Sequence, residues 1–572
     1  MGSVQLPGCS RTPREGLVVR KWNALLICVG MFASCAEAPP ARVEPLAAIP
    51  APRSIVAAPG FFRLTADIRV HAEPQLRETA ERQFAALRRT TGFPLQHDEA
   101  AAQFHVSASR DLPPEGYRLH VSSNEITIEA ADPAGAFYAF QTLRQLLPPV
   151  VEQKAHVPGV DWVVPAGVVE DWPRFPYRGL HLDVGRHYFD VEFVKRYIDV
   201  MARFKLNRFH WHLTEDQGWR LEIDAYPNLT ATGAWRRETV EAKNRDPYVG
   251  DGVPHGGFYT KDDVREIVAY AAERFVTVIP EIEMPGHATA AIAAYPELGC
   301  TNAQLEVSTR WGVHETIYCP HEATFEFLET VLDEVIELFP SEYIHIGGDE
   351  VRKRQWEESA AAQAVMRREG LASEEELQSW FIRRIERHLR SRGRRLIGWD
   401  EILEGGLPRD ATVMSWRGIE GGIAAARQGH DVVMSPVEHA YFDYYQGDPN
   451  EEPLAMNSRD FGITLEKAYA FEPIPDVLTP TEARHILGPQ ANVWTEYIKT
   501  PAHVEYMAYP RALALSEVAW TPRDRRDYGD FIERLGAVLP HLDALGVNYR
   551  RPDELRAAET RAPGEAAPRG GP

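Results

Sequence analysis

Short apolar runs alternate with segments of helical period along the carboxyl-terminal part of the chain. Segments such as VEFVKRYIDVMARFK and TFEFLETVLDEVIELF repeat apolar residues every three or four positions, which is typical of amphipathic helices. Between them lie runs that favour strands, eight in number: RGLHLDV, NRFHWHLT, FVTVIPEI, EYIHIGG, RRLIGWDE, TVMSW, DVVMSP and LGPQANVW. Eight strands alternating with helices over about 350 residues predict an α/β fold, a (β/α)8 TIM barrel over residues 173–525.

The same alternation leaves one other fold open, a doubly wound open sheet. That fold is disfavoured because no glycine-rich dinucleotide turn follows the first apolar run. The long segments 215–259 and 437–485 are expected to be loops on the barrel. Residues 526–551 are expected to form its carboxyl-terminal helical end.

An α+β pattern without a strand–helix–strand rhythm precedes the barrel. GFFRLTADIRVHA, AAQFHVSA and EGYRLHVSSNEITIEAAD favour strands, the last with a turn at Ser123 and Asn124. EPQLRETAERQFAALRRTTG favours a helix that ends at Gly92, and AGAFYAFQTLRQLL favours a second helix. We therefore expect a small separate α+β domain over residues 56–172.

The first 35 residues contain the parts of a secretory signal peptide. Arg20 and Lys21 precede a short apolar run and small residues, and the run is too short to span a bilayer. FASC, ending at Cys35, resembles a bacterial lipoprotein box with Phe in place of the usual Leu. Cys35 is then a lipid anchor; the other interpretation is ordinary signal-peptidase cleavage a few residues later. We expect an exported bacterial protein, periplasmic or an outer-membrane lipoprotein, with no other membrane contact.

Composition and charge exclude some classes of partner. The 572 residues are 44% hydrophobic and 25% charged, as in ordinary globular proteins, and the net charge of −21 disfavours nucleic acid or an anionic membrane as partner. The Ala- and Pro-rich residues 36–55 are typical of a linker, and residues 552–572 of a disordered tail. Nothing in the pattern indicates an oligomeric state.

Two of the five cysteines lie in the expected folded body. Cys9, Cys28 and Cys35 fall within the first 35 residues, which leaves Cys300 and Cys319. In an exported protein, two cysteines that close a short loop favour a disulfide. The alternative is two unrelated buried thiols.

Carboxylates and aromatic residues recur where the predicted barrel strands end. In a barrel of this kind the active site is built at the carboxyl ends of the strands. Such a mouth suits a neutral sugar, because carboxylates bind hydroxyl groups and Trp faces cover the apolar side of the ring. The residues at these ends are Asp183, Arg186, Glu215, Asp216, Glu281, Glu283, His287, Asp349, Glu350, Trp399, Asp400, Glu401, Trp416, Tyr441, Asp443, Trp494 and Glu496.

Asp349 and Glu350 are adjacent carboxylates that directly follow two glycines. Neighbours in an extended strand point to opposite faces, but Gly347 and Gly348 permit an irregular strand end from which both turn toward one pocket. An ordinary retaining glycosidase places its nucleophile and its acid about 5 Å apart, on the two sides of the sugar. Sequence neighbours approach from one side, so they favour an acid and a helper, with a nucleophile that belongs to the substrate.

An ordered set of motifs from Pro173 to Trp520 carries a family resemblance. RGLHLDVGRHYF, HWHLTEDQGWR, PEIEMPGHA, HIGGDE, GWDE, ANVWTE and RALALSEVAW resemble glycoside hydrolase family 20, the β-N-acetylhexosaminidases, and the preceding domain resembles the small amino-terminal domain of that family. In this family the substrate's 2-acetamido oxygen attacks the anomeric carbon and forms an oxazolinium intermediate. The resemblance therefore implies Glu350 as general acid and base, and Asp349 as the group that orients the acetamido N–H.

The resemblance also implies roles for other strand-end residues. Arg186, Asp443 and Glu496 would contact sugar hydroxyls, Tyr441 the acetamido oxygen, and three tryptophans the sugar face and the N-acetyl group. His287, Glu283 and Glu215 would support the acid, although Glu215 and Glu283 stand where many members have Asp. The tryptophans are Trp399, Trp416 and Trp494.

The resulting hypothesis is an exo-acting β-N-acetylhexosaminidase that acts on oligosaccharides or glycoconjugates. Alternatives are a family relative of different specificity, such as a lacto-N-biosidase or an endo-acting biofilm hydrolase, and an inactive sugar-binding barrel. No cofactor or metal is expected, because neither a CxxC nor an HExxH pattern occurs. His210 and His212 alternate on one strand like metal ligands, but we interpret them as structural.

Overall fold

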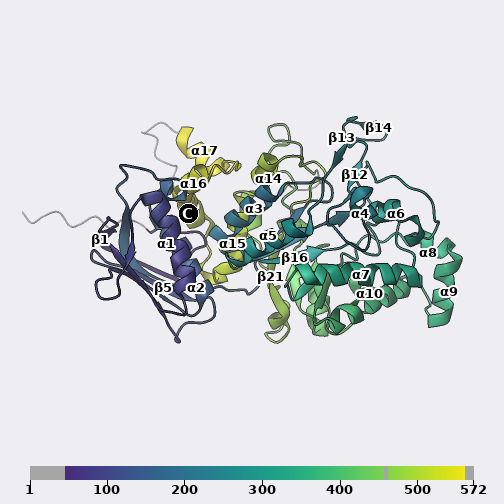
Figure 1. Ribbon diagram of the computed structural model, residues 1–572, viewed down its shortest axis with the longest axis horizontal. Helices are drawn as coiled ribbons and strands as arrows, with labels where there is room; N and C mark the ends of the chain where they lie inside the picture. Colours follow the sequence, from purple (N-terminus) through teal and green to yellow (C-terminus); the bar gives the residue numbers. More distant parts are fainter. Residues whose placement is uncertain (1–45, 457–461, 561–572) are drawn as a thin grey trace, which may run out of the picture. The chain divides into compact units, whose positions relative to one another are not determined.

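The computed structural model describes residues 46–456 and 462–560, and its carboxyl-terminal part is a closed barrel of eight parallel strands (Figure 1). All eight runs that favoured strands form this barrel, so the predicted TIM barrel is confirmed. The order around the barrel is β16-β17-β18-β19-β20-β21-β8-β9. The strands are β8 (Gly179–Asp183), β9 (Arg208–His212), β16 (Thr277–Glu281), β17 (Tyr343–His345), β18 (Arg395–Trp399), β19 (Thr412–Ser415), β20 (Val432–Met434) and β21 (Ile486–Ala491).

Helices between the strands bury their apolar stripes against the barrel. Side-chain caps start several of them: Asp190 accepts from the Phe193 N–H at α3, and Thr260 and Asp263 form a capping box at α5. The longer helices are α3 (Val191–Arg203), α5 (Lys261–Ala272), α7 (Glu322–Leu338), α9 (Ala360–Glu369), α10 (Glu374–Ser391), α11 (Glu420–Gln428), α14 (Pro501–Ala508), α15 (Arg511–Trp520) and α16 (Tyr528–Leu545).

The two long segments predicted as loops contain short elements of their own. Residues 215–259 hold small two-stranded sheets, in which β10 pairs with β11, β12 with β15 and β13 with β14. Short helices lie in these two segments and in other loops of the barrel. The elements are β10 (Thr214–Glu215), β11 (Gly218–Trp219), β12 (Trp235–Arg236), β13 (Val240–Arg245), β14 (Tyr248–Gly250), β15 (His255–Gly256), α4 (Asn228–Ala231), α6 (Thr289–Ala294), α8 (Arg354–Glu358), α12 (Val437–Ala440) and α13 (Leu465–Tyr469).

The amino-terminal domain is a mixed sheet of seven strands with two helices on it (Figure 1). The sheet order is β1-β7-β5-β6-β4-β2-β3, and the stretch expected as one strand over residues 60–72 is divided between β1 and β2. Phe84, Phe104 and Phe140 pack together between helices and sheet. The elements are β1 (Ser54–Arg63), β2 (Arg69–Ala72), α1 (Arg77–Thr91), β3 (Gln96–His97), β4 (Phe104–Ala108), β5 (Tyr117–Val121), β6 (Ile126–Ala130), α2 (Pro133–Leu146) and β7 (Val163–Asp171).

Both expected flanking segments differ from the structure where it describes them. Residues 46–55 of the expected linker belong to the folded body: Ile49 is fully buried, its N–H donates to Gln145, and β1 already begins at Ser54. Residues 553–560 of the expected tail form α17 (Asp553–Thr560). The expected signal peptide, including Cys35, lies outside the described residues. Among residues 46–456 and 462–560, no helix is long and apolar enough to cross a membrane.

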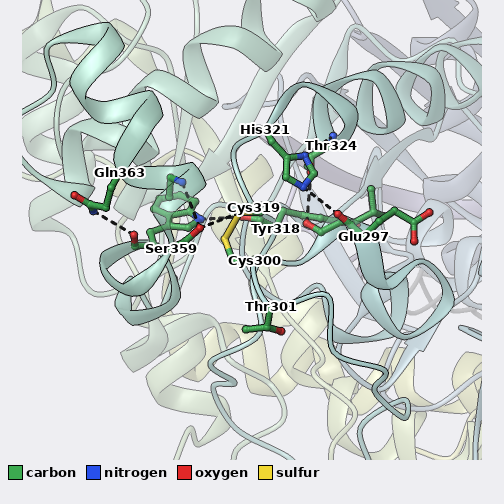
Figure 2. The surroundings of a disulfide bond; sticks show 12 residues. Glu297, Cys300, Thr301, Tyr318, Cys319, His321, Thr324, Ser359 and Gln363 are labelled. Atoms are coloured by element: carbon green, nitrogen blue, oxygen red, sulfur yellow. Dashed lines mark hydrogen bonds between the residues drawn. A yellow bond between two sulfur atoms is a disulfide. The ribbon is translucent and has the colours of Figure 1, made fainter.

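The predicted disulfide between Cys300 and Cys319 is present (Figure 2). It closes a loop with a sequence separation of 19 residues. Tyr318, beside it, accepts a hydrogen bond from the indole N–H of Trp356 at 2.8 Å, which ties the base of the loop to α8. The bridge therefore anchors a segment that lies between β16 and β17 and returns to the barrel mouth.

A buried carboxylate joins the amino-terminal domain to the barrel. Asp171, at the end of β7, accepts hydrogen bonds from the Lys205 ammonium at 2.9 Å, the Tyr117 hydroxyl at 2.8 Å and the Trp520 indole at 2.8 Å. The side chains of Asp171 and Lys205 have no exposed surface. An ionised pair removed from water in this way is stable only while its partners remain in place.

Asp171→Ala should lower the free energy of unfolding by about 3–5 kcal/mol, because it leaves the Lys205 ammonium buried without its counter-charge. Urea denaturation followed by circular dichroism measures the change. The matched control is Glu358→Ala, which breaks an ion pair with Arg354 whose side chains are 70% and 65% exposed. Equal stability of the two variants would contradict a special role for the buried pair.

Candidate active site

The backbone turns sharply after β17, where Gly347 and Gly348 have φ angles of 67° and 90°. Only glycine adopts such angles without strain. A Cβ atom on Gly347 would lie 1.7 Å from a carboxylate oxygen of Glu283, and one on Gly348 would lie 2.6 Å from Ile402. Glu350 itself has a φ of 50°. The two glycines thus create the irregular strand end that the sequence predicted.

This turn brings the side chains of Asp349 and Glu350 to one imidazole. Nε2 of His287 lies 3.6 Å from Oδ2 of Asp349 and 3.6 Å from Oε2 of Glu350. Asp349 is the more enclosed, with 13% of its side chain exposed against 36% for Glu350. The adjacent carboxylates therefore face the same region and approach it from the same side.

The other nitrogen of His287 is held by two carboxylates. Nδ1 lies 2.8 Å from Oε1 of Glu215 and 3.2 Å from Oδ2 of Asp216. Burial alone would lower the pKa of His287, but Glu215 and Asp216 together with Asp349 raise it well above its usual value. Burial likewise opposes ionisation of Glu215, yet Arg186 and His287 hold its pKa well below the usual range. We infer an imidazolium ion at His287, fixed from behind and facing Asp349 and Glu350.

Glu283 takes a different place from the one predicted for it. Both of its carboxylate oxygens are buried and have no hydrogen-bond partner among the described residues. Burial, and after it the charge of Asp349, raise the pKa of Glu283 well above its usual value. A neutral carboxylic acid therefore packs against Gly347, and the hydrogen-bonded support of His287 comes from Glu215 and Asp216 instead.

Arg186 is positioned by the turn that follows β8. Asp183 accepts hydrogen bonds from the N–H groups of Gly185 and Arg186 at 2.8 and 3.1 Å, and its other oxygen lies 3.4 Å from the guanidinium. Glu215 holds the same guanidinium at 3.0 Å, and Trp494 lies beneath it with 5.0 Å from Cζ to the ring centroid. Nε of Arg186 is buried without a protein partner among the described residues. It remains a donor for a ligand.

Four aromatic side chains named from the sequence form one group. Trp416 and Tyr441 stack with 6.0 Å between ring centroids, and Trp494 lies 6.2 Å from Tyr441 and 5.7 Å from Trp399. Trp399 is the deepest of them, with 1% of its surface exposed. Carboxylates orient two of the indoles: Glu281 accepts from Trp399 at 2.9 Å and Glu401 accepts from Trp416 at 2.8 Å.

Asp443 and Glu496 lie beyond this group, after β20 and β21. Burial, followed by repulsion from Glu496, raises the pKa of Asp443 well above its usual value. Burial also raises the pKa of Glu496, although Arg186 opposes it. A raised pKa favours the protonated form, so these two carboxyl groups offer donors as well as acceptors to hydroxyl groups.

Several buried polar atoms of the site have no protein partner among the described residues. They include Oδ1 of Asp349, Oδ1 of Asp443 and the indole nitrogen of Trp494. Buried polar atoms are nearly always hydrogen-bonded in folded proteins, so unpaired ones at a strand-end cluster indicate places for ligand atoms or water. Donors and acceptors next to aromatic faces fit a sugar better than an apolar ligand.

Histidines surround Glu281 inside the barrel, beneath Trp399. Nε2 of His210 lies 3.0 Å from one oxygen of Glu281, Nδ1 of His345 lies 2.7 Å from the other, and His212 also contacts the carboxylate. These atoms are close enough to share a metal ion, but His212 and Glu281 are already hydrogen-bonded to each other. Burial lowers and Glu281 raises the pKa of His212, with a net value of about 10. This charged pair favours the structural role predicted for His210 and His212.

A cavity of about 300 Å³ borders the other side of Glu350. Its lining includes Val313, Gln378, Glu401 and Arg417. Val313 belongs to the loop that the disulfide closes. The space adjoins the more exposed of the two adjacent carboxylates, so a group bonded to a sugar in the site has room there.

Two family descriptions match the chain over nearly all of its described length. The catalytic domain of glycosyl hydrolase family 20 matches residues 175–523, and domain 2 of the same family matches residues 46–172. The chain belongs to glycosyl hydrolase family 20. The family accounts for both domains and begins the first of them at residue 46, within the expected linker.

Relatives of this chain in the family are β-hexosaminidases. That of Porphyromonas gingivalis is 49% identical over 449 residues, covering 78% of this chain but 56% of its own length, and that of Vibrio furnissii is 38% identical over 486 residues, covering 84% and 77%. The family 20 β-N-acetylhexosaminidase of Streptomyces coelicolor superposes with a TM-score of 0.78 at 32% identity over 90% of this chain and 99% of its own. The exo β-N-acetylglucosaminidase of Vibrio harveyi, in complex with N-acetylglucosamine, gives 0.80 at 35% identity over 91% and 80%.

Sequence reasoning identified the strand ends but missed several positioning residues. Asp183, Asp216, Glu281 and Glu401 stood among the strand-end residues, yet nothing in their spacing revealed what they contact. Each holds a side chain of the family 20 site, and all but Asp183 do so from another strand or loop: Arg186, His287, Trp399 and Trp416 respectively. Four carboxylates that each follow a buried apolar run were the available signal.

Gly347→Ala should destabilise the fold more than Gly370→Ala does. Gly370 has a similar φ of 71° but open space around the missing Cβ, so its replacement carries only the left-handed strain of about 1–2 kcal/mol. Gly347→Ala adds the clash with Glu283, which we expect to cost about 1–3 kcal/mol more. Urea unfolding measures both variants. Equal losses would mean that Glu283 moves away freely.

Glu401→Gln should change how stability depends on pH. Burial, then the charges of Asp349 and Asp400, raise the pKa of Glu401 from 4.5 to about 8. The folded state therefore holds a proton that the unfolded chain has lost, so the Glu401 contribution to stability falls as pH rises between these values. Relative to the parent, the variant should gain in thermal midpoint as pH rises from about 5 to about 8.

Glu404→Gln is the matched control for this measurement. The Arg417 guanidinium lies 3.7 Å from Glu401 and 3.0 Å from Glu404. The side chain of Glu404, however, is 42% exposed. Its curve of thermal midpoint against pH should run parallel to that of the parent. A parallel curve for Glu401→Gln as well would contradict a neutral Glu401.

Proposed function

We propose that this protein is an exo-acting β-N-acetylhexosaminidase that releases terminal non-reducing β-linked GlcNAc or GalNAc with retention of configuration. The observation that carries the proposal is the convergence of Asp349 and Glu350 on one nitrogen of His287, 3.6 Å from each. Carboxylates that share one side of a site do not flank a sugar as nucleophile and acid. The β-hexosaminidase relatives support the same activity.

Four other carboxyl groups of the mouth have raised pKa values, which disfavours them as nucleophiles. Burial is the largest cause that raises the pKa of each of Glu283, Glu401, Asp443 and Glu496, and a protonated carboxyl group does not attack an anomeric carbon. Asp349 lies beside the acid rather than across from it. The nucleophile that fits is the carbonyl oxygen of the substrate's own 2-acetamido group.

The reaction then has two steps. In the first, Glu350 donates its proton to the glycosidic oxygen while the acetamido oxygen bonds to C1, the leaving group departs as an alcohol and an oxazolinium ion forms. Asp349 accepts a hydrogen bond from the acetamido N–H and stabilises the positive charge. In the second, Glu350 takes a proton from water as the water oxygen bonds to C1 and the ring opens. Two inversions at C1 give net retention.

The remaining site residues bind and orient the sugar in this proposal. Arg186, Asp443 and Glu496 take the hydroxyl groups on the far side of the ring, and the Tyr441 hydroxyl donates to the acetamido oxygen. The imidazolium of His287 holds the two adjacent carboxylates on one side of the sugar. The walls around the N-acetyl group and the ring face are Trp399, Trp416 and Trp494.

The proposal includes export of the protein from the cytosol. The disulfide between Cys300 and Cys319 supports an oxidising compartment, since such bridges persist outside the cytosol. We propose a periplasmic or outer-membrane location, with a lipid on Cys35 as the only membrane anchor. Mass spectrometry of the mature amino terminus from cell fractions tests it. A diacylated Cys35 in the membrane fraction is expected, and an unprocessed Met1 would contradict export.

Replacing the two adjacent carboxylates should separate their roles. Glu350→Gln should lower kcat/KM about 10²–10⁴-fold on chitobiose, which has a poor leaving group, and much less on an aryl glycoside whose leaving group needs little protonation. Asp349→Asn should lower kcat for p-nitrophenyl β-GlcNAc by a factor of about 10² or more. Glu357→Gln, an exposed carboxylate on α8, is the control and should keep parental rates.

The substrate-assisted step is tested with p-nitrophenyl β-GlcNAc, p-nitrophenyl β-glucoside and GlcNAc-thiazoline. We expect hydrolysis of the N-acetyl substrate alone, and competitive inhibition by the thiazoline, which resembles the oxazolinium ion. Comparable hydrolysis of the glucoside, or indifference to the thiazoline, would require a protein nucleophile and overturn the mechanism.

A further inference from the structure

A hairpin of residues 240–250 projects at the edge of the barrel domain (Figure 1). It consists of β13 and β14 and is inserted after β9. The loop closed by the disulfide contacts both ends of the hairpin. The Val240 N–H donates to the carbonyl oxygen of Thr309 at 3.0 Å, and the Tyr248 hydroxyl donates to Oγ1 of Thr309 at 3.0 Å. Arg310 covers the Tyr248 ring at 4.7 Å.

The end of the hairpin where Arg245 pairs with Tyr248 also contacts loops from the far side of β8. Arg245 donates to the Tyr497 hydroxyl at 2.8 Å. The Lys243 ammonium lies 5.4 Å from the ring centroids of both Tyr445 and Tyr497. Because β8 stands between β9 and β21 in the barrel, a hairpin that starts after β9 and reaches Tyr497 crosses the end of β8. Arg186 lies at that end.

The space beneath the hairpin is filled. Trp311, 5% exposed, packs with Val240 and Tyr497 in one apolar cluster. His187 lies under Trp311 with 5.6 Å between their ring centroids and binds the carbonyl oxygen of Thr495 through Nδ1 at 2.6 Å. A continuous layer of side chains therefore joins the hairpin to the residues that flank Arg186 and Glu496.

The order of strands fixes which part of a sugar faces this layer. β17, which carries Glu350, and β21, which precedes Glu496, are four strands apart in either direction around the eight-stranded barrel and so lie opposite each other. The acid protonates the oxygen on C1, so C1 faces the β17 side. C4 lies across the pyranose ring from C1, and O4 with its neighbour O3 therefore faces β21 and the hairpin.

We propose that hairpin 240–250 is the specificity element that restricts the enzyme to terminal sugars. A residue attached at O3 or O4 would occupy the space of Lys243, Arg245 and the tyrosines that they contact. The opposite side has the cavity of about 300 Å³ beside Glu350, which accommodates the leaving group. This inference rests on the proposed hexosaminidase function and adds the structural cause of its exo action.

The test uses aryl glycosides whose GlcNAc is capped by galactose. The p-nitrophenyl β-glycosides of Galβ1-3GlcNAc and Galβ1-4GlcNAc release nitrophenol only if the disaccharide is accepted whole, because a hexosaminidase does not remove galactose. The parent should hydrolyse p-nitrophenyl β-GlcNAc and leave both capped substrates intact. A variant with residues 241–249 replaced by two glycines should gain at least about tenfold in kcat/KM on a capped substrate over the parental background.

The double variant Lys243→Ala/Arg245→Ala tests the same contact without shortening the backbone. It should show a smaller gain on a capped substrate and keep p-nitrophenyl β-GlcNAc hydrolysis within about threefold of the parent, which also reports that it is folded. Glu241→Ala, an exposed side chain of the same hairpin, is the matched control and should gain nothing.

The outcomes separate the two proposals. If the parent fails on p-nitrophenyl β-GlcNAc, the proposed function is wrong. If the parent hydrolyses that substrate but also cleaves the capped ones, or if folded variants still reject both capped substrates, the hairpin is not the determinant. A gain in hydrolysis of a capped substrate by the double variant Lys243→Ala/Arg245→Ala supports the proposal even if the shortened variant does not fold.

Discussion

The site depends on one turn of backbone after β17. Gly347 and Gly348 occupy left-handed conformations that other residues do not adopt without strain, and Gly347 additionally leaves the space that Glu283 fills. Without this turn, Asp349 and Glu350 would point to opposite faces of a strand. With it, two like charges stand side by side, and the imidazolium of His287 faces both.

The charges of the mouth are arranged around that imidazolium. Glu215 and Asp216 fix it from behind, and Glu215 also binds Arg186. A single carboxylate thus couples the His287 side of the site to the Arg186 side. Burial raises the pKa of four other carboxyl groups of the mouth, those of Glu283, Glu401, Asp443 and Glu496. A chain with a net charge of −21 thereby lowers the negative charge at its site, which suits a neutral substrate.

Local pattern was enough to predict the barrel, because every strand is a buried apolar run and the polar residues after it meet at one end. The local pattern was also enough to predict the glycine turn, because Gly347 and Gly348 directly precede Asp349 and Glu350. It was insufficient for Glu283, whose position depends on the space left by Gly347, and for the contacts of Glu281 and Glu401, which lie on other strands. The domain boundaries were misjudged for a related reason. The Ala- and Pro-rich residues 46–53 have no strong local pattern, and Ile49 is buried only because Gln145 and the barrel end provide its surroundings.

In the proposal made above, the layer formed by the hairpin, Trp311 and Tyr497 closes the sugar site on one side, and the cavity beside Glu350 is its opening. One opening then serves the arriving chain end, the hydrolytic water and both products. While the shortened chain still occupies it, the released monosaccharide has no exit and water has no path to C1. Departure is therefore ordered: the shortened chain leaves first and the single sugar last. Such an enzyme releases its polymer after every cleavage. It therefore acts on many chain ends in turn and is not processive.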